Sequence, residues 1–136
     1  MKKISIVILT LMMCSIAAKA QDCANGIVET GVNGNTYCRA KVGMNWYSAL
    51  VWCQKQGMHL VTMTELCDKD DTPAGKWDGT TGSGKCLNFA SGQSSFNGYV
   101  WTSTISSSTN AYYVRLSNST VSYSTRSYGS CYPLCK

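Results

Sequence analysis

Carboxylates gather in one stretch of the chain in which glycine, serine and threonine are frequent. Asp68, Asp70 and Asp71 stand close together, and Asp78 follows shortly after them. Carboxylate oxygens at such spacing are ligands that calcium prefers. The stretch lacks the D-x-D-x-D-G order of the best-known calcium loop, however, and nearby lysines offset part of its negative charge. Two interpretations therefore stand, a solvated acidic loop and an atypical calcium site, and no other cofactor is expected.

Aromatic residues provide a second kind of recognition chemistry, because their rigid amphipathic rings suit binding surfaces and stack on sugar faces. Trp77 lies within the same glycine-rich stretch, so we expect its ring to be exposed. Trp46, Trp52 and Trp101 lie in apolar segments, and we expect these three in the core. The predicted ligand-binding residues are Trp77, Asp70, Asp71 and Asp78.

Catalytic chemistry finds little support in the chain. His59 is the only histidine and lies beside a segment expected to be buried, and no serine has a G-x-S-x-G setting. No C-x2-C pair is present, which together with the single histidine disfavours a structural zinc site. We therefore predict that the protein is not an enzyme and has no catalytic residues and no dedicated metal ligands.

The N-terminus predicts export. A basic start at Lys2 precedes a largely apolar run over 4–18, and the run closes in an A-x-A pattern that ends at Ala20. The run is shorter than the roughly 20 residues that a membrane span needs. We predict a signal peptide at 1–20, no membrane span after its cleavage, and a secreted, periplasmic or cell-surface protein of bacterial type. An uncleaved N-terminal anchor is the alternative.

Cleavage also changes the charge of the protein. Lys2, Lys3 and Lys19 leave with the signal peptide, so the formal net charge falls from +5 to +2. No cluster of lysine and arginine remains, so nucleic acid is not expected as a partner.

Cysteine is the most informative residue type in the mature chain. Seven cysteines remain, because Cys14 leaves with the signal peptide. In an oxidising compartment this density predicts disulfides. Seven is an odd number, so one thiol stays free or pairs with another chain. Their spacing alone leaves the connectivity open.

Local patterns place the elements that must position these residues. Asn45 is a good N-cap for a helix whose apolar face includes Trp46, Ala49 and Cys53. Gly57 has the place of a C-terminal glycine and ends this helix.

The remaining elements follow in chain order. A shorter helix is expected at 63–68, because Thr62 and Glu65 have capping-box spacing. The stretch 68–98 shows little periodicity, and a loop of that length indicates function or local disorder. Strands are expected at 99–104, 111–116 and 120–126. The sequence therefore predicts an α+β domain.

Several short segments of the chain also follow one another in a familiar order. The first are Tyr37-Cys38, Asn45-Trp46-Tyr47-Ser48-Ala49 running to Cys53, Gly57-x-x-Leu60, and Glu65. The later ones are Val100-Trp101-Thr102-Ser103, Ala111-Tyr112-Tyr113-Val114-Arg115-Leu116 and Leu134-Cys135. In order and spacing they resemble the C-type lectin-like domain superfamily, in its bacterial secreted branch, over nearly the whole mature chain.

The resemblance implies a fold and a set of disulfides. It implies an α+β, C-type lectin-like domain over 21–136, with two helices, small antiparallel sheets and a long disulfide-anchored loop. The implied pairs are Cys53 with Cys135 and Cys67 with Cys86. Three cysteines then remain, namely Cys23, Cys38 and Cys131. They allow one further bridge and one leftover thiol, and we count Cys23 and Cys38 among the bridged cysteines.

The resemblance also implies a binding role, although the chain departs from the sugar-binding members. Their calcium-holding tripeptides, Glu-Pro-Asn or Gln-Pro-Asp and Trp-Asn-Asp, are all missing, so calcium-dependent carbohydrate binding is not carried over. We expect an adhesion-type module that recognises an extracellular glycan or surface protein through its long loop. The alternatives are a structural component of a surface appendage or envelope assembly, joined through the odd cysteine or an exposed strand, and a small secreted enzyme.

Overall fold

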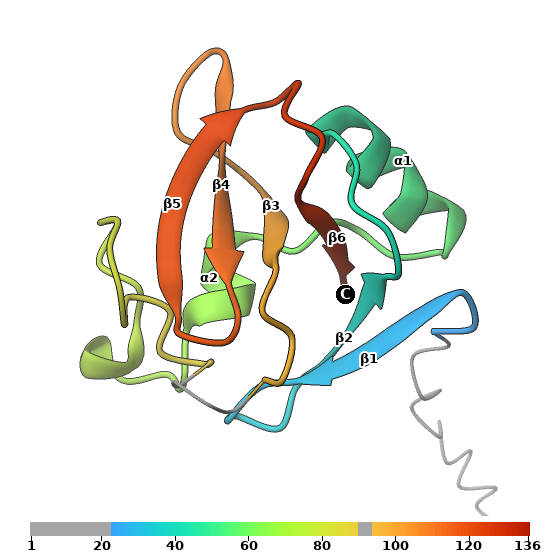
Figure 1. Ribbon diagram of the computed structural model, residues 1–136. Helices are drawn as coiled ribbons and strands as arrows, with labels where there is room; N and C mark the ends of the chain where they lie inside the picture. The colour runs from blue at the N-terminus through green and yellow to red at the C-terminus, as the bar shows by residue number, and fades with distance from the viewer. Residues whose placement is uncertain (1–22, 90–93) are drawn as a thin grey trace, which may run out of the picture.

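The computed structural model describes residues 23–89 and 94–136 (Figure 1). The strands are β1 (Gly26–Thr30), β2 (Thr36–Ala40), β3 (Tyr99–Ile105), β4 (Asn110–Arg115), β5 (Thr120–Thr125) and β6 (Tyr132–Cys135). The helices are α1 (Trp46–Lys55) and α2 (Met63–Cys67), with a 3-10 turn η1 at Pro73–Gly75. The strands form one sheet in the order β1-β2-β6-β3-β4-β5. All neighbours are antiparallel except β3 and β6, which run parallel.

The predicted α+β, C-type lectin-like fold is wrong. The structure is mostly β, with one six-stranded mixed sheet and only two α-helices in the described residues, which are 10 and 5 residues long. The prediction gave separate small sheets, whereas β6 joins the N-terminal hairpin to the C-terminal strands in a single sheet. The expected strands at 99–104, 111–116 and 120–126 are present as β3, β4 and β5.

No bounds were assigned from the sequence to the strands β1 and β2, which form a hairpin. These two unassigned strands account for part of the difference between the expected and the observed β content. β1 contains the β-branched run Ile-Val, and β2 contains Thr-Tyr, residues that favour strands. Between them Gly34 has a φ of 80°, a conformation that glycine adopts without a steric penalty. The Gly31 amide donates to the Asn35 carbonyl at 2.9 Å and continues the ladder into the turn.

A core lies on each face of the sheet. Val100 and Trp101 are neighbours in β3, so their side chains point to opposite faces. Val100 belongs to a buried cluster with Leu66 of α2, whereas Trp101 belongs to a second cluster with Ala49 of α1. The sheet is therefore covered by α1 on one face and by α2 with part of the long connection on the other.

The two helices begin as their sequences predict. The Asn45 side chain caps α1 by accepting from the Ser48 amide at 2.9 Å. Thr62 and Glu65 form the expected capping box at the start of α2. The indole of Trp46 then fixes α1 to the sheet, because its Nε1 donates to the Thr102 carbonyl at 2.8 Å.

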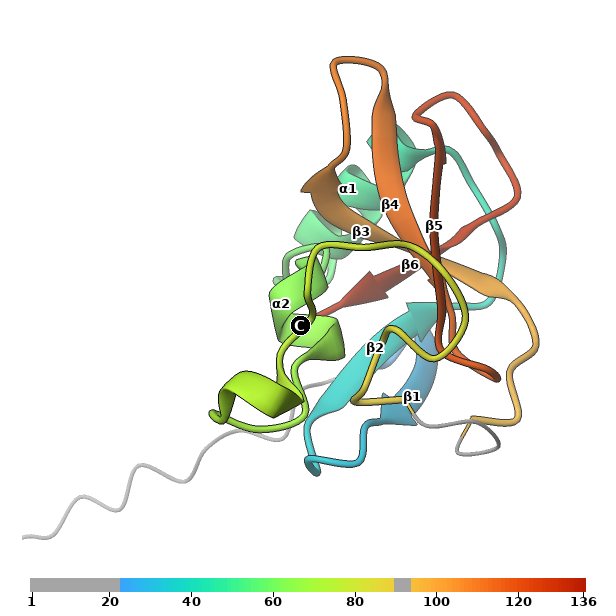
Figure 2. The same cartoon turned by 90° about the vertical axis from the view of Figure 1, so that its left-hand side faces the viewer.

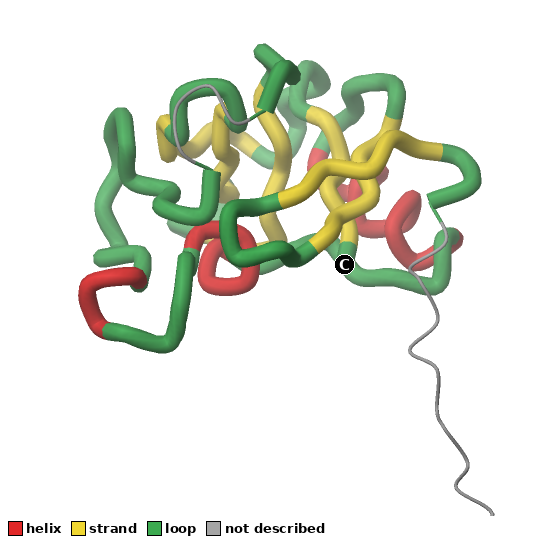
Figure 3. The backbone as a smooth tube through the Cα atoms, turned by 90° about the horizontal axis from the view of Figure 1, so that it is seen from below, coloured by secondary structure: helices red, strands yellow, loops and turns green. Residues whose placement is uncertain are grey.

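The connection between α2 and β3 passes along the free edge of β5 (Figure 2). Gly82 and Val121 exchange both backbone hydrogen bonds, each at 2.9 Å, and the Lys85 amide donates to the Ser119 carbonyl at 3.0 Å. Figure 3 shows this connection as loop, apart from one short helical turn. Its described part therefore closes the β5 edge at Val121.

Three disulfides connect the described elements. Cys53 is bonded to Cys135 and Cys67 to Cys86, the two pairs that the resemblance implies, and Cys23 is bonded to Cys38. Cys131 is the free cysteine of the described residues, and it is buried.

The predicted signal peptide at 1–20 lies outside the described residues. Within 23–89 and 94–136, neither helix has the length and apolar character that a membrane crossing requires.

The disulfides lead to a ranked stability prediction. Replacing Cys53 and Cys135 together by Ala should lower the free energy of unfolding by about 4–5 kcal/mol, and replacing Cys23 and Cys38 by about 3 kcal/mol. The first pair is separated by 82 residues and the second by 15, and closing the longer loop restricts the unfolded chain more. Denaturant unfolding of the two double variants measures both losses. Equal losses, or a larger loss for the shorter loop, would contradict the chain-entropy explanation.

Candidate functional site

The carboxylates of the long loop hydrogen-bond to their own turns. Asp70 accepts from the Thr72 amide at 2.9 Å and also from the Thr72 hydroxyl, which lowers the pKa of Asp70. Asp78 accepts from the Thr80 hydroxyl and amide and forms an ion pair with Lys85 at 3.1 Å. Together these contacts lower the pKa of Asp78 to about 2, and the hydrogen bond from the Thr80 hydroxyl contributes most.

Trp77, the predicted exposed contact, is half-buried in the structure. Its ring meets Tyr112 of β4 edge-on, with 5.1 Å between the centroids, and packs against the buried cluster on the α2 side. Its Nε1 donates to the Thr80 carbonyl at 2.9 Å, and its amide donates to the Asp68 carboxylate at 2.9 Å. The indole thus holds the loop against the sheet.

The residues predicted to bind ligand do not meet in one hollow. Asp70 and Asp71 line a polar hollow of about 190 Å³. Asp78 lines a different one of about 320 Å³, and Trp77 lines neither. The loop therefore brings together Asp70 and Asp71 but separates them from the other two.

The described residues contain no group of three or more His, Cys, Asp or Glu side chains placed to hold a metal ion. Asp68, Asp70 and Asp78 each accept a backbone hydrogen bond from their own loop. These bonds direct the carboxylates to separate turns, so we assign no calcium ligand set to this loop.

His59 has a structural partner. Its Nε2 lies 2.9 Å from both carboxylate oxygens of Glu65, which also accepts from the Thr62 amide at 2.9 Å. Burial alone would raise the pKa of Glu65, but the Thr62 amide and His59 outweigh this effect, so the pKa is lowered. The pair ties the segment before α2 to the first turn of that helix.

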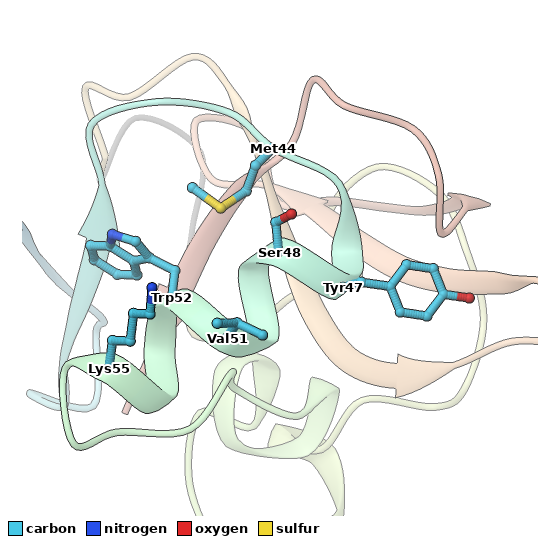
Figure 4. Close-up of a pocket in the computed structure, with 6 residues that line it drawn as sticks. All are labelled: Met44, Tyr47, Ser48, Val51, Trp52 and Lys55. Carbon is cyan, nitrogen blue, oxygen red and sulfur yellow. The ribbon is translucent and has the colours of Figure 1, made fainter.

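The outward side of α1 carries a hollow of about 410 Å³, which is called the α1 hollow here (Figure 4). Its lining residues are Met44, Tyr47, Ser48, Val51, Trp52 and Lys55. Tyr47 is 53% exposed and Val51 is 49% exposed, so both present apolar surface to solvent. The polar groups among the lining side chains are the hydroxyls of Ser48 and Tyr47, the indole N–H of Trp52 and the ammonium of Lys55.

Helical spacing and a fixed neighbouring segment build the α1 hollow. Tyr47 and Val51 are four residues apart and so lie on one side of α1, away from the buried Ala49. Met44 precedes the helix and is held in place by two hydrogen bonds. Its amide donates to the Cys131 carbonyl at 2.8 Å, and its carbonyl accepts from Trp101 Nε1 at 2.9 Å.

Tyr47 also borders a second hollow of about 290 Å³, called the Arg126 hollow here. Its other lining residues are Thr109, Thr125, Arg126 and Ser127. The Arg126 guanidinium carbon lies 5.3 Å from the Trp46 ring centroid and 5.5 Å from that of Tyr47, within the range of cation–π attraction. The guanidinium also donates to the Ser108 carbonyl. These contacts hold one positive charge beside the Tyr47 ring.

Sequence reasoning missed the α1 hollow because it considered only the inner stripe of the helix. Trp52 was expected in the core, yet it is half-buried and lines the hollow. The available signal was the pair Tyr47 and Val51, two large apolar residues on the helix side that faces away from Ala49.

The position of Trp77 leads to a stability prediction. Trp77→Ala should lower the free energy of unfolding by about 2 kcal/mol, because a half-buried ring loses its contacts with Tyr112 and the cluster behind it. Thermal unfolding measures the loss. Tyr128→Ala is the control, since Tyr128 is 43% exposed, and it should change stability by less than about 0.5 kcal/mol. An unchanged melting temperature for Trp77→Ala would make Trp77 a free surface residue.

A second prediction concerns Asp78. Thr80→Val removes the hydroxyl that lowers the Asp78 pKa, so that pKa should rise from about 2 toward the ordinary aspartate value of about 3.9. Because the folded-state pKa lies below the unfolded value, the stability that Asp78 contributes is present at neutral pH and is lost as the pH falls toward 2. Carboxyl carbon NMR during a pH titration measures the pKa. Thr72→Val should leave Asp78 unaffected, and equal pKa values in the wild type and Thr80→Val would refute the assignment.

A scan against protein-family models finds no match for the chain, and a search of curated proteins finds no significantly similar sequence. Inference about function therefore rests on the residues described above.

Proposed function

We propose that the protein is a binding module of the cell exterior or periplasm that holds a protein ligand by an apolar side chain seated in the α1 hollow. The observation that carries this proposal is the hollow itself. Large apolar side chains such as Tyr47 and Val51 stay about half exposed around it, on a helix whose other face is fixed in the core.

The lining chemistry favours a protein ligand. Aromatic residues and methionine are enriched at protein interfaces, and the α1 hollow combines Met44, Tyr47 and Trp52. Carbohydrate needs many directional hydrogen bonds, whereas the other lining residues, apart from Ser48 and Lys55, present mainly apolar or aromatic surface. The hollow therefore suits an apolar or aromatic anchor residue.

Charge adds a second requirement on the ligand. Lys55 lines the α1 hollow, and the Arg126 guanidinium carbon lies 5.5 Å from the centroid of the Tyr47 ring. Two cations beside an apolar site attract carboxylates and raise the rate of encounter with an acidic partner. We therefore expect acidic residues next to the anchor in the ligand.

Disulfides support the proposed location. Three bridges in a small domain are typical of secreted, periplasmic or cell-surface proteins, and rare in a reducing cytosol. The predicted signal peptide at 1–20 supports the same compartments.

A role as a covalently linked structural component has less support. That alternative joined a partner through the odd cysteine or an exposed strand, and the odd cysteine, Cys131, is fully buried. Burial raises the pKa of the Cys131 thiol to about 12, so the reactive thiolate is scarce at neutral pH.

A glycan ligand is the second candidate, and the Arg126 hollow favours it. There the Tyr47 ring stands beside the hydroxyls of Thr109, Thr125 and Ser127 and the Arg126 guanidinium. An aromatic face with several hydrogen-bonding groups is suited to a sugar ring.

Affinity selection tests the proposed function. A random peptide library displayed on phage is selected on the wild-type protein, and the enriched peptides should share an apolar or aromatic residue flanked by Asp or Glu. Tyr47→Ala should weaken the binding of such a peptide by about 1–3 kcal/mol, because Tyr47 is a large exposed residue that lines the hollow. Fluorescence polarisation with the labelled peptide measures the affinity.

Tyr123→Ala is the matched control, since Tyr123 is 52% exposed and lies on β5. It should leave the affinity unchanged. Peptides that bind Tyr47→Ala as tightly as the wild type would sink the proposed site. A glycan array that gives Tyr47-dependent binding, where the peptide library gives none, would favour the second candidate instead.

A further inference from the structure

Asparagine is followed directly by glycine at several places in the chain. The pairs are Asn25-Gly26, Asn33-Gly34 and Asn97-Gly98. In such a pair the amide nitrogen of the glycine can attack the side-chain carbonyl carbon of the asparagine. Glycine favours this attack because it has no Cβ to obstruct the approach and its backbone is permissive. All three asparagines are exposed in the structure, so neither sequence nor exposure separates the three sites.

Backbone hydrogen bonds set two of these pairs apart from the third. The attacking nitrogen must lose its proton, and a hydrogen-bonded amide does so only after its bond has opened. The Gly26 amide donates to the Cys23 carbonyl at 3.1 Å, and the Gly34 amide donates to the Gly31 carbonyl at 3.0 Å. Both nitrogens are therefore engaged in the folded protein, and we expect these two sites to react slowly.

The Gly98 amide is not engaged in this way. It donates no hydrogen bond to any residue within 23–89 and 94–136. The ladder of β3 with β4 begins one residue later, with the pair Tyr99 and Arg115. Among the three glycines, Gly98 is thus the one whose nitrogen can react without the prior opening of a hydrogen bond.

The side chain of Asn97 is also prepared for the attack. Asn97 precedes β3 and Ser117 follows β4, and the Ser117 hydroxyl donates to Asn97 Oδ1 at 2.9 Å. This bond withdraws electron density from the side-chain carbonyl carbon. It also becomes stronger when the oxygen gains negative charge in the tetrahedral intermediate, as in an oxyanion hole.

Packing of the neighbouring Phe96 requires glycine at position 98. The Arg39 guanidinium carbon lies 3.5 Å from the centroid of the Phe96 ring, and Tyr132 meets that ring edge-on at 4.9 Å. A Cβ on Gly98 would lie 2.2 Å from Phe96 Cζ, and the ring is held by both neighbours. The residue that permits the attack on Asn97 is therefore fixed by the fold.

We propose that Asn97 is a self-modification site at which the folded protein deamidates with water as the only co-reactant. The Gly98 nitrogen forms a bond to Asn97 Cγ and gives its proton to water. The bond from Cγ to Nδ2 breaks, and Nδ2 takes up a proton and leaves as ammonia. Water then opens the five-membered succinimide at either of its two carbonyl carbons. The products are aspartate and isoaspartate at position 97, and no electrons are transferred.

The reaction changes the protein in two ways. A carboxylate replaces a neutral amide, so the protein gains one negative charge at neutral pH. In the isoaspartate product the main chain runs through the former side chain and gains one carbon atom directly before β3. We expect this product to unfold more easily than the unmodified protein. The site shares no residue with the α1 hollow or the Arg126 hollow, so it does not depend on the proposed function.

Timed incubation of the exported protein in mildly alkaline buffer, followed by peptide mapping with mass spectrometry, tests the proposal. Deamidation at Asn97 should be at least about tenfold faster than at Asn25 or Asn33, because those two sites require local opening. The reduced and unfolded chain is the control. There the three sites should react within about threefold of one another, since no native hydrogen bond distinguishes them.

Ser117→Ala tests the hydrogen bond to Asn97. It should slow deamidation at Asn97 by about 3- to 10-fold, which is the effect of one neutral hydrogen bond. Ser95→Ala is the matched control, because Ser95 is an exposed serine two positions before Asn97, and it should leave the rate unchanged. Matching melting temperatures show that both variants are folded.

Several results would overturn the proposal. One is equal rates at the three sites in the folded protein, and another is a faster reaction at Asn25 or Asn33. The proposal also fails if Asn97 deamidates only in the unfolded chain, or if Ser117→Ala does not lower the rate at Asn97.

Discussion

The position of β6 determines the rest of the structure. This last strand lies in the middle of the sheet, bonded to β2 on one side and parallel to β3 on the other. The N-terminal hairpin and the C-terminal strands therefore share one sheet only because the end of the chain is inserted between them. The Cys53–Cys135 disulfide ties this strand to α1, and the paired backbones of His59 and Lys136 tie it to the segment before α2. Closing so large a part of the chain on itself has a high entropic cost, which the disulfide reduces by restricting the unfolded chain.

The same constraint decides which surfaces remain for recognition. Because Cys53 and Ala49 are fixed against the sheet, α1 cannot rotate, and Tyr47 and Val51 are held outward on a rigid base. The Cys67–Cys86 disulfide fixes one part of the long loop to α2. Gly82 in this loop pairs with β5, and Trp77 packs against Tyr112 of β4. The loop that was expected to bind ligand is thus engaged in the fold, and the helix that was expected to be structural carries an apolar hollow. A rigid site of this kind binds without a large ordering cost.

Local chemistry was readable from the sequence, and long-range topology was not. The starts of both helices could be predicted from Asn45, Thr62 and Glu65, because their capping hydrogen bonds join residues only three positions apart. The strands at β3 to β5 follow from β-branched and aromatic runs between turns. The joining of β6 to both halves depends on contacts between distant segments, which no local pattern encodes, and so the fold class came out wrong. Trp77 was misjudged for a related reason. A tryptophan among glycines looks exposed until Tyr112, 35 positions further along the chain, is placed beneath its ring.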